Sequence, residues 1–286
     1  MTLHYAVPWI GSVATDMSRI AIVAAMEREL RPLVRNWKSR TIEQGGRQFR
    51  IFERRCEQGE VAVVFGGIGA EAARRATQAV IQEMNPGRVL SVGFAGALDA
   101  SLQVGDVLEP RTVINAADGA RTDTGTGAGV LVSSGSVAGK ERKLSLARAY
   151  GATAVDMEAA AVAQGAQAGG VGFGALKAIS DAADFSLPAM DGFVAGDGTF
   201  RSLKFASYVA VRPWLWGTTI ALARNSARAS RALCEALERY LDRSGDPRTL
   251  RQRNAPDESS GSGLNPTKAS PEFASAHTTD GPESHT

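Results

Sequence analysis

The stretch "AEAARRATQAVIQEMNPGRVLSVGFAGAL", residues 70–98, holds one helix pattern and one strand pattern in immediate succession. Residues 70–84 repeat small and apolar side chains at the spacing of one helix face. The Asn-Pro-Gly sequence at 85–87 ends that helix, because proline cannot continue it. Residues 88–98 are then nearly all apolar or small, as in a strand covered on both faces of a sheet. The stretch therefore predicts strands and helices that alternate and pack on each other.

The same alternation continues on both sides of this stretch. We predict further strands over residues 19–26, 47–55, 60–69, 105–115 and 153–157, and a strand that runs into a loop over residues 171–184. We predict further helices over residues 27–37, 140–150, 158–169, 200–211 and 214–241. Near-continuous apolar strands between helices are typical of an α/β sandwich around a mixed sheet. In such folds ligands bind at the carboxyl ends of the strands.

The two ends of the chain differ in composition from this body. Residues 1–17 show no period, and residues 243–286 are rich in Ser, Pro, Gly and charged residues. A segment of that composition buries too little apolar surface to fold, so we expect both ends to be disordered. We assign one domain to residues 18–242 and find no internal repeat in it.

The bulk composition excludes several classes of protein. A formal net charge of +2 gives no electrostatic case for a nucleic-acid partner. No apolar run reaches the roughly 18 residues of a membrane span and no secretion signal is visible, so we expect a cytoplasmic protein. The two cysteines make no disulfide framework. The three histidines all lie near the ends, so we expect no histidine triad and no metal site, and acid–base chemistry must use Asp and Glu.

Acidic and small residues collect where five predicted strands end. These positions are Glu27 and Glu29, the glycines within 66–69, the small residues of 93–98, Asp156 with Glu158, and Asp181. A buried carboxylate costs free energy unless another group compensates its charge, so several together indicate a shared pocket. Taken singly, each has a structural alternative: first-turn acids that favour the helix dipole, a tight glycine turn, or a helix N-cap at Asp181.

Five motifs follow one another in the chain: "IAIVAAMEREL", "GGIGAEAA", "GFAGALDASLQVGDV", "AVDMEAAAVAQ" and "LKAISDAAD". In this order they resemble the nucleoside phosphorylase/nucleosidase superfamily, and most of all its methylthioadenosine/S-adenosylhomocysteine nucleosidases. The resemblance spans residues 19–184 and then weakens. It implies a three-layer α/β/α sandwich whose mixed sheet is partly barrel-like. It also implies a homo-oligomer without metal or cofactor, inorganic phosphate being a co-substrate only if the reaction is phosphorolysis.

The resemblance also implies roles for individual residues. Asp181 matches the general acid that protonates the leaving purine at N7, and Ser180 would orient it. Glu158 matches the glutamate that binds the 2′ and 3′ hydroxyls of the sugar, with Met157 lying against the sugar ring. Glu29 matches the carboxylate that activates water, as in glycoside hydrolysis, with Glu27 as the competing candidate.

The remaining implied site residues lie on loops and strand ends. Gly67, Ile68 and Gly69 would turn backbone amides toward the attacking water or phosphate. Phe94, Ala95, Gly96 and Val137 would contact the substrate. Asp156 stands where the family has a glutamate, and a structural role is an equal alternative.

Three departures separate the chain from the nucleosidases. Phe94 replaces a serine near the nucleophile, so a phosphate site would need another donor, such as Arg74 or Arg75. Val137 stands in the run where the nucleosidases place an aromatic side chain that stacks on the base. The loop over residues 115–130 is short for a segment that covers the substrate.

After residue 184 the chain is instead similar to hopanoid-associated phosphorylases, which act on an adenosyl-bearing lipid. Trp214 and Trp216 lie there in an apolar segment. That segment either packs on the core or on another subunit, or it meets a lipid surface, where tryptophan is favoured.

We therefore expect an enzyme that cleaves the N-glycosidic bond of an adenosine-type nucleoside. Hydrolysis is favoured because Glu29 is present and the serine at position 94 is not. The alternative enzyme is a phosphorylase acting on an adenosylated lipid or another purine nucleoside, and the alternative of a different class is a nucleoside-binding module without turnover. A dinucleotide-binding fingerprint fails, because Ala72 stands at its third glycine position.

Overall fold

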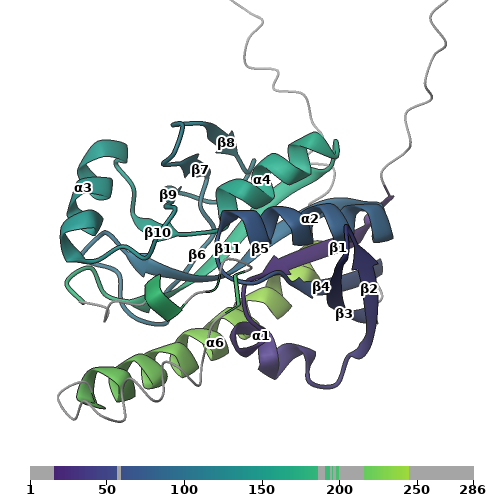
Figure 1. Cartoon of the computed structure of the whole chain (residues 1–286), viewed down its shortest axis with the longest axis horizontal. Coiled ribbons are helices and arrows are strands. Elements are labelled where there is room, and N and C mark those ends of the chain that lie inside the picture. The colour runs from purple at the N-terminus through teal and green to yellow at the C-terminus, as the bar shows by residue number, and fades with distance from the viewer. Residues whose placement is uncertain are drawn as a thin grey trace, which may run out of the picture. The chain divides into compact units, whose positions relative to one another are not determined.

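The computed structural model describes residues 16–56, 59–185, 191–193, 195, 198–199 and 216–244. Figure 1 shows these residues as a sheet with helices on both of its faces. The elements in chain order are β1 (Asp16–Ala24), α1 (Glu27–Val34), β2 (Lys38–Gln44), β3 (Arg47–Cys56), β4 (Gly59–Phe65), α2 (Ala70–Met84), β5 (Pro86–Ala97), β6 (Val107–Leu108), β7 (Thr112–Asn115), β8 (Arg121–Asp123), β9 (Val130–Ser133), α3 (Lys140–Tyr150), β10 (Ala154–Asp156), α4 (Ala159–Ala168), β11 (Gly172–Asp181), the 3-10 turn η1 (Asp191–Phe193) and α6 (Trp216–Ser244).

The 11-stranded sheet is mixed, as the alternation of strands and helices predicts. Its main path runs β2-β3-β4-β1-β5-β10-β9-β7-β8, and β11 pairs with β5 and β6. The central strand β5 pairs in parallel with β1 and β11 and antiparallel with β10. Within the described residues the sheet stays open, with β2 and β8 at the ends of its path, so it does not close into the partly barrel-like form that the resemblance implies.

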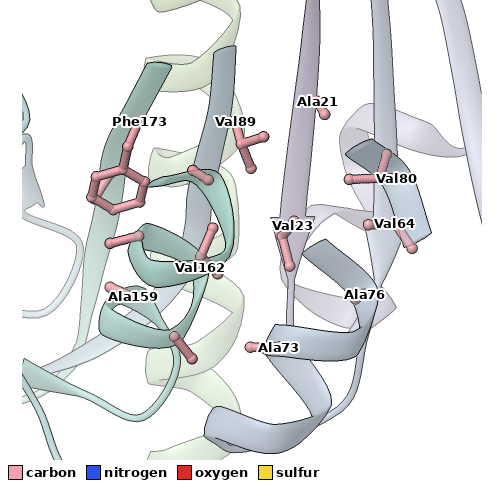
Figure 2. Close-up of a cluster of buried hydrophobic side chains, with 14 of the residues drawn as sticks. Ala21, Val23, Val64, Ala73, Ala76, Val80, Val89, Ala159, Val162 and Phe173 are labelled. Carbon is pink, nitrogen blue, oxygen red and sulfur yellow. The ribbon is translucent and has the colours of Figure 1, made fainter. Parts of the chain in front are cut away.

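Of the three hydrophobic clusters among the described residues, the two larger ones lie on opposite faces of the sheet, because side chains alternate along each strand. From β1, Ala21 and Val23 join the core beneath α2 and α4. Figure 2 shows this cluster, with side chains of both helices meeting those of β1 and β5. The neighbouring residues Ile22 and Ala24 point to the other face, where they pack with α1 and α6. The result is the expected three-layer α/β/α sandwich.

Small residues let α2 and α4 pack closely on this sheet. A methyl group added at Gly165 of α4 would lie 2.7 Å from the side chain of Thr77 on α2, and one at Gly66 would lie 2.8 Å from the side chain of Ala76. The alanine run after Glu158 forms the buried side of α4. These close approaches hold the segments before and after the two helices near each other, and those segments carry candidate site residues.

Three strands are absent from the sequence prediction. β2 is an edge strand with mostly exposed residues, and β8 and β9 lie in or beside the segment 115–130 that we expected to be a loop. The predicted strand 105–115 is two short strands, β6 and β7, separated by Pro110 and its neighbours. The predicted helix 200–211, Trp214, the side chain of Trp216 and the three histidines fall outside the described residues, as does most of both predicted disordered ends. None of the described helices is both long and apolar enough to serve as a membrane span.

Candidate active site

One cavity of about 1080 Å³ opens at the carboxyl ends of β1, β5, β10 and β11. Its wall includes Glu29, Glu158 and Asp181, which are far apart in the chain. Residues of α1 and α6 also line it, as do loop and strand-end residues: Ala25, Met26, Ile68, Phe94, Ala95, Gly96, Ser136, Val137, Ala138, Lys143, Val155, Asp156, Met157 and Ser180. The strand topology thus brings the predicted acids to one concave site.

Glu29 lies in the first turn of α1 and folds back over the start of the helix. Its Oε2 accepts hydrogen bonds from the backbone amides of Ala25, at 3.2 Å, and Met26, at 3.1 Å. Burial raises the pKa of Glu29, and the Met26 amide and the charge of Lys177 lower it in part. Glu27 points elsewhere: it is exposed, and its carboxylate lies 3.8 Å from Arg50. Of the two candidates, only Glu29 lines the cavity.

Glu158 precedes α4 and holds the glycine loop in place. Its Oε1 accepts a hydrogen bond from the amide of Gly69 at 2.8 Å, and its Oε2 accepts one from the amide of Met157 at 3.3 Å. Burial, followed by the nearby charge of Asp156, raises the pKa of Glu158 to about 7. Two amide donors still leave acceptor positions on a carboxylate, which can accept about four hydrogen bonds.

The glycine loop before α2 differs from its predicted role. Gly67 and Gly69 have φ values of 102° and 97°, which glycine adopts without strain. The amides of Gly67, Ile68 and Gly69 donate to Ala25 O, Gly198 O and Glu158, respectively. These amides are therefore satisfied within the protein and do not face a nucleophile. Ile68 lines the cavity with its side chain, whereas the two glycines do not line it.

Asp156 belongs to a buried network beneath the site. Ser133 Oγ donates to its Oδ1 at 2.5 Å, the Ala159 amide donates to its Oδ2 at 2.9 Å, and Lys177 Nζ lies 2.9 Å from Oδ2. Lys177 also donates to Ser91 Oγ at 3.0 Å. Every contact of Asp156 is internal, which favours the structural alternative for this residue.

Asp181 ends β11, is buried and binds two other side chains. Ser180 Oγ donates to its Oδ1 at 2.7 Å, and Lys143 Nζ of α3 donates to its Oδ2 and, at 2.7 Å, to Ala182 O. Gly96 makes room for this pair, because a methyl group there would lie 2.8 Å from Asp181 Oδ2 and 3.2 Å from Lys143 Cε. Asp181 is therefore not an N-cap but one partner of a buried ion pair.

Two arginines that we considered as phosphate donors lie elsewhere. Arg74 and Arg75 are exposed on α2 and both bind Glu71. Neither lines the cavity, and Phe94 lies in the wall. Phe94 is also the sole aromatic side chain among the described residues of the wall.

Two buried lysines, Lys143 and Lys177, were not predicted from the sequence. Lys177 stands in the apolar run "GALKAIS", and a charge inside a buried strand must have a partner, so this signal was present in the sequence. Lys143 gave no such signal, because "KERK" has the composition of an exposed helix start. Over the described ranges, no group of three or more His, Cys, Asp or Glu side chains is placed to hold a metal ion.

The family model of the phosphorylase superfamily matches residues 19–133 and 124–197, more than half of the chain. The chain belongs to the phosphorylase superfamily. A 5′-methylthioadenosine/S-adenosylhomocysteine nucleosidase of Marinomonas sp. (strain MWYL1) is 31% identical over 99 residues, which are 35% of this chain and 42% of that protein. The corresponding enzyme of Staphylococcus haemolyticus is 32% identical over 95 residues, 33% of this chain and 41% of that protein. The chain thus spans less than half the length of these curated relatives.

Solved structures show the same superfamily fold. Futalosine hydrolase of Helicobacter pylori superposes with a TM-score of 0.59 at 21% identity, covering 79% of this chain and 98% of that one. A methylthioadenosine/S-adenosylhomocysteine nucleosidase from Colwellia psychrerythraea, solved with adenine, gives a TM-score of 0.51 at 25% identity, covering 57% of this chain and 82% of that one. The α/β architecture described above is thus that of the phosphorylase superfamily.

Proposed function

We propose that this phosphorylase-superfamily chain hydrolyses the N-glycosidic bond of an adenosine-type purine nucleoside. The observation that carries the proposal is the convergence of Glu29, Glu158 and Asp181 on one cavity. Its supporting comparisons are the superfamily match and the 31% identity over 99 residues to a methylthioadenosine/S-adenosylhomocysteine nucleosidase. Cleavage of this bond needs a proton for the leaving base, stabilisation of a cationic sugar and a nucleophile, and three carboxyl groups suit these three tasks.

The carboxylate of Glu158 is suited to bind the sugar hydroxyl groups. Its two oxygens each accept one amide hydrogen bond and keep further acceptor positions for two neighbouring hydroxyl groups. Donors to its carboxylate favour the ionised form, so a bound ribose would lower the pKa that burial raises. The resulting negative charge stabilises the oxocarbenium-like sugar. Met157 lies beside it in the cavity wall and offers an apolar, polarisable surface to the ring.

Glu29 is suited to act as the general base that activates the nucleophile. A general base works best when its pKa lies close to the working pH, and burial moves the pKa of Glu29 upward in that direction. We favour water over phosphate as the attacking group because Glu29 is present and Phe94 replaces the serine, although Arg28, Arg31, Arg35 and Arg231 also line the cavity. Asp181, held by Ser180, is the group through which the leaving purine is protonated.

The test is an assay of base release from adenosine, methylthioadenosine, S-adenosylhomocysteine and inosine, each with and without phosphate. We expect a free sugar as the product, at a rate that does not depend on phosphate; a sugar 1-phosphate would instead identify a phosphorylase. Asp181→Asn should lower kcat by about 10²–10⁴-fold. Asp184→Asn, an exposed neighbour outside the cavity wall, is the matched control and should leave kcat unchanged.

Equal rates for the parent and Asp181→Asn would overturn the catalytic assignment and leave a nucleoside-binding module. The homo-oligomeric state, the cytoplasmic location and a lipid contact through Trp214 and Trp216 stay predictions of the sequence. Native mass measurement in solution tests the first of these directly.

A further inference from the structure

The general acid proposed for the leaving base is bound to a lysine. Lys143 Nζ donates to Asp181 Oδ2 and to Ala182 O, and the side chains of Lys143 and Asp181 are only 2% and 6% exposed. Both residues line the cavity, together with Ser136, Val137 and Ala138, which precede α3. The ion pair is thus part of the cavity wall.

The hydrogen bonds of Asp181 bear on the source of the proton that the leaving purine receives. Both oxygens of Asp181 accept hydrogen bonds, Oδ1 from Ser180 and Oδ2 from Lys143. An adjacent ammonium group favours the ionised form of a carboxyl group. With both oxygens of Asp181 already accepting hydrogen bonds, the ammonium group of Lys143 is the proton donor that lies against this acid.

We propose that Lys143 stores the proton that the leaving purine receives and delivers it through Asp181. This inference rests on the proposed function. As the C1′–N bond breaks, its electron pair stays with the purine, and a proton moves from Lys143 Nζ to Asp181 Oδ2 and on to N7. Water supplies the hydroxyl group at C1′ and its proton goes to Glu29. Before the next turnover Glu29 releases its proton to solvent, and Lys143, left as a neutral amine, takes one up.

The ion pair of the other buried lysine, Lys177, provides a comparison with the Lys143 pair. Lys177 has a carboxylate and a hydroxyl partner, and its partner Asp156 accepts two further hydrogen bonds from Ser133 and the Ala159 amide. Among the described residues, Lys143 has two acceptors for the three N–H groups of an ammonium. Gly96 keeps the backbone clear at the same point. Lys177 has the same number of acceptors, but it does not line the cavity, whereas both partners of the Lys143 pair do.

Two substitutions separate proton supply from charge and packing. Lys143→Met removes both the charge and the proton. Lys143→Arg keeps a positive charge and hydrogen-bond donors, but a guanidinium group does not release a proton in proteins. We expect both variants to lose about 10²-fold or more in kcat on the best nucleoside, with KM changed by less than about threefold. A role limited to positioning Asp181 predicts that Lys143→Arg recovers the parental kcat.

A substrate whose leaving group needs no proton gives the second readout. 4-Nitrophenyl β-D-ribofuranoside is such a substrate, because its leaving group departs as a stable phenolate. The Lys143→Met and Lys143→Arg variants should therefore cleave it at close to the parental rate. Recovery of kcat by Lys143→Arg, or an equal loss on both substrates, would overturn the role of Lys143 while leaving the nucleosidase proposal intact. Failure of the parental protein to release a base from any nucleoside would instead overturn the proposed function itself.

Discussion

Lys177 Nζ lies 2.9 Å from Asp156 Oδ2, and both side chains are buried, with Asp156 in the cavity wall. Burial by itself lowers the pKa of a lysine, but the carboxylates of Asp156, Glu158 and Glu29 together raise the pKa of Lys177 above its usual value. A single buried cation therefore compensates three acids that meet at one site. Without it, the acids of the candidate site would repel each other in a region of low dielectric.

Lys177→Met should destabilise the fold, because it leaves the Asp156 carboxylate buried without its cation. Removing one partner of a buried ion pair costs about 3–5 kcal/mol, which urea unfolding measures as a lower free energy of unfolding. Adding Asp156→Asn should recover part of the loss. Arg75→Met, which breaks an exposed pair with Glu71, is the control and should change stability far less. If Lys177→Met and Arg75→Met lowered the free energy of unfolding by similar amounts, the stabilising role of Lys177 would be contradicted.

Glu158→Gln should stabilise the protein while it impairs catalysis. The folded-state pKa of Glu158 is about 7 against an ordinary value of 4.5, so the folded state holds this proton more tightly than the unfolded state does. Parental stability therefore falls as the pH rises through this window. Glutamine carries no such penalty, so the variant should be more stable at pH 8 by up to about 3 kcal/mol, and much less so at pH 5. Urea unfolding at both values checks this, and a pH-independent difference would be the contrary result.

Gly96→Ala should misplace the Lys143–Asp181 pair. The added methyl group would lie 2.8 Å from Asp181 Oδ2 and 3.2 Å from Lys143 Cε, so the pair must move. A shift of about 1 Å in catalytic geometry can lower kcat by about 10²-fold. Gly135→Ala, where nothing lies within 4 Å of the added methyl, is the matched control. The measurement is kcat of the Gly96→Ala and Gly135→Ala variants. Equal values would show that catalysis tolerates displacement of the Lys143–Asp181 pair.

Ser133→Ala should weaken the start of α4. The Ser133 hydroxyl donates to Asp156 Oδ1 and accepts from the Ala160 amide at 2.9 Å, so its loss leaves two buried groups without a partner. Unsatisfied buried groups cost about 1–3 kcal/mol, measured again by urea unfolding. Ser39→Ala removes an exposed hydroxyl that accepts from Arg50 at 3.3 Å, and should have little effect. Equal effects of the two would mean that the network around Asp156 contributes nothing to stability.

The class of the fold follows from local patterns in the chain. The helix over 70–84, its end at Asn85 and the buried strand that follows depend on hydrophobic spacing and on turn chemistry, both of which act over a few residues. The same holds for the acids at the strand ends, because the strands that carry them are recognisable one by one. Glu29 and Asp181 then meet through the parallel pairing of β1, β5 and β11, and Glu158 joins them because β10 pairs antiparallel with the end of β5.

Contacts between distant segments were beyond this local information. The choice of Glu29 over Glu27 depends on how α1 sits on the sheet, and the satisfied amide of Gly69 depends on Glu158, 89 positions away in the chain. The pair of Lys143 with Asp181 joins α3 to β11. A charged side chain on a helix start is usually solvated, and only the packing of that helix over the cavity turns Lys143 inward and makes an ion pair its lowest free-energy state.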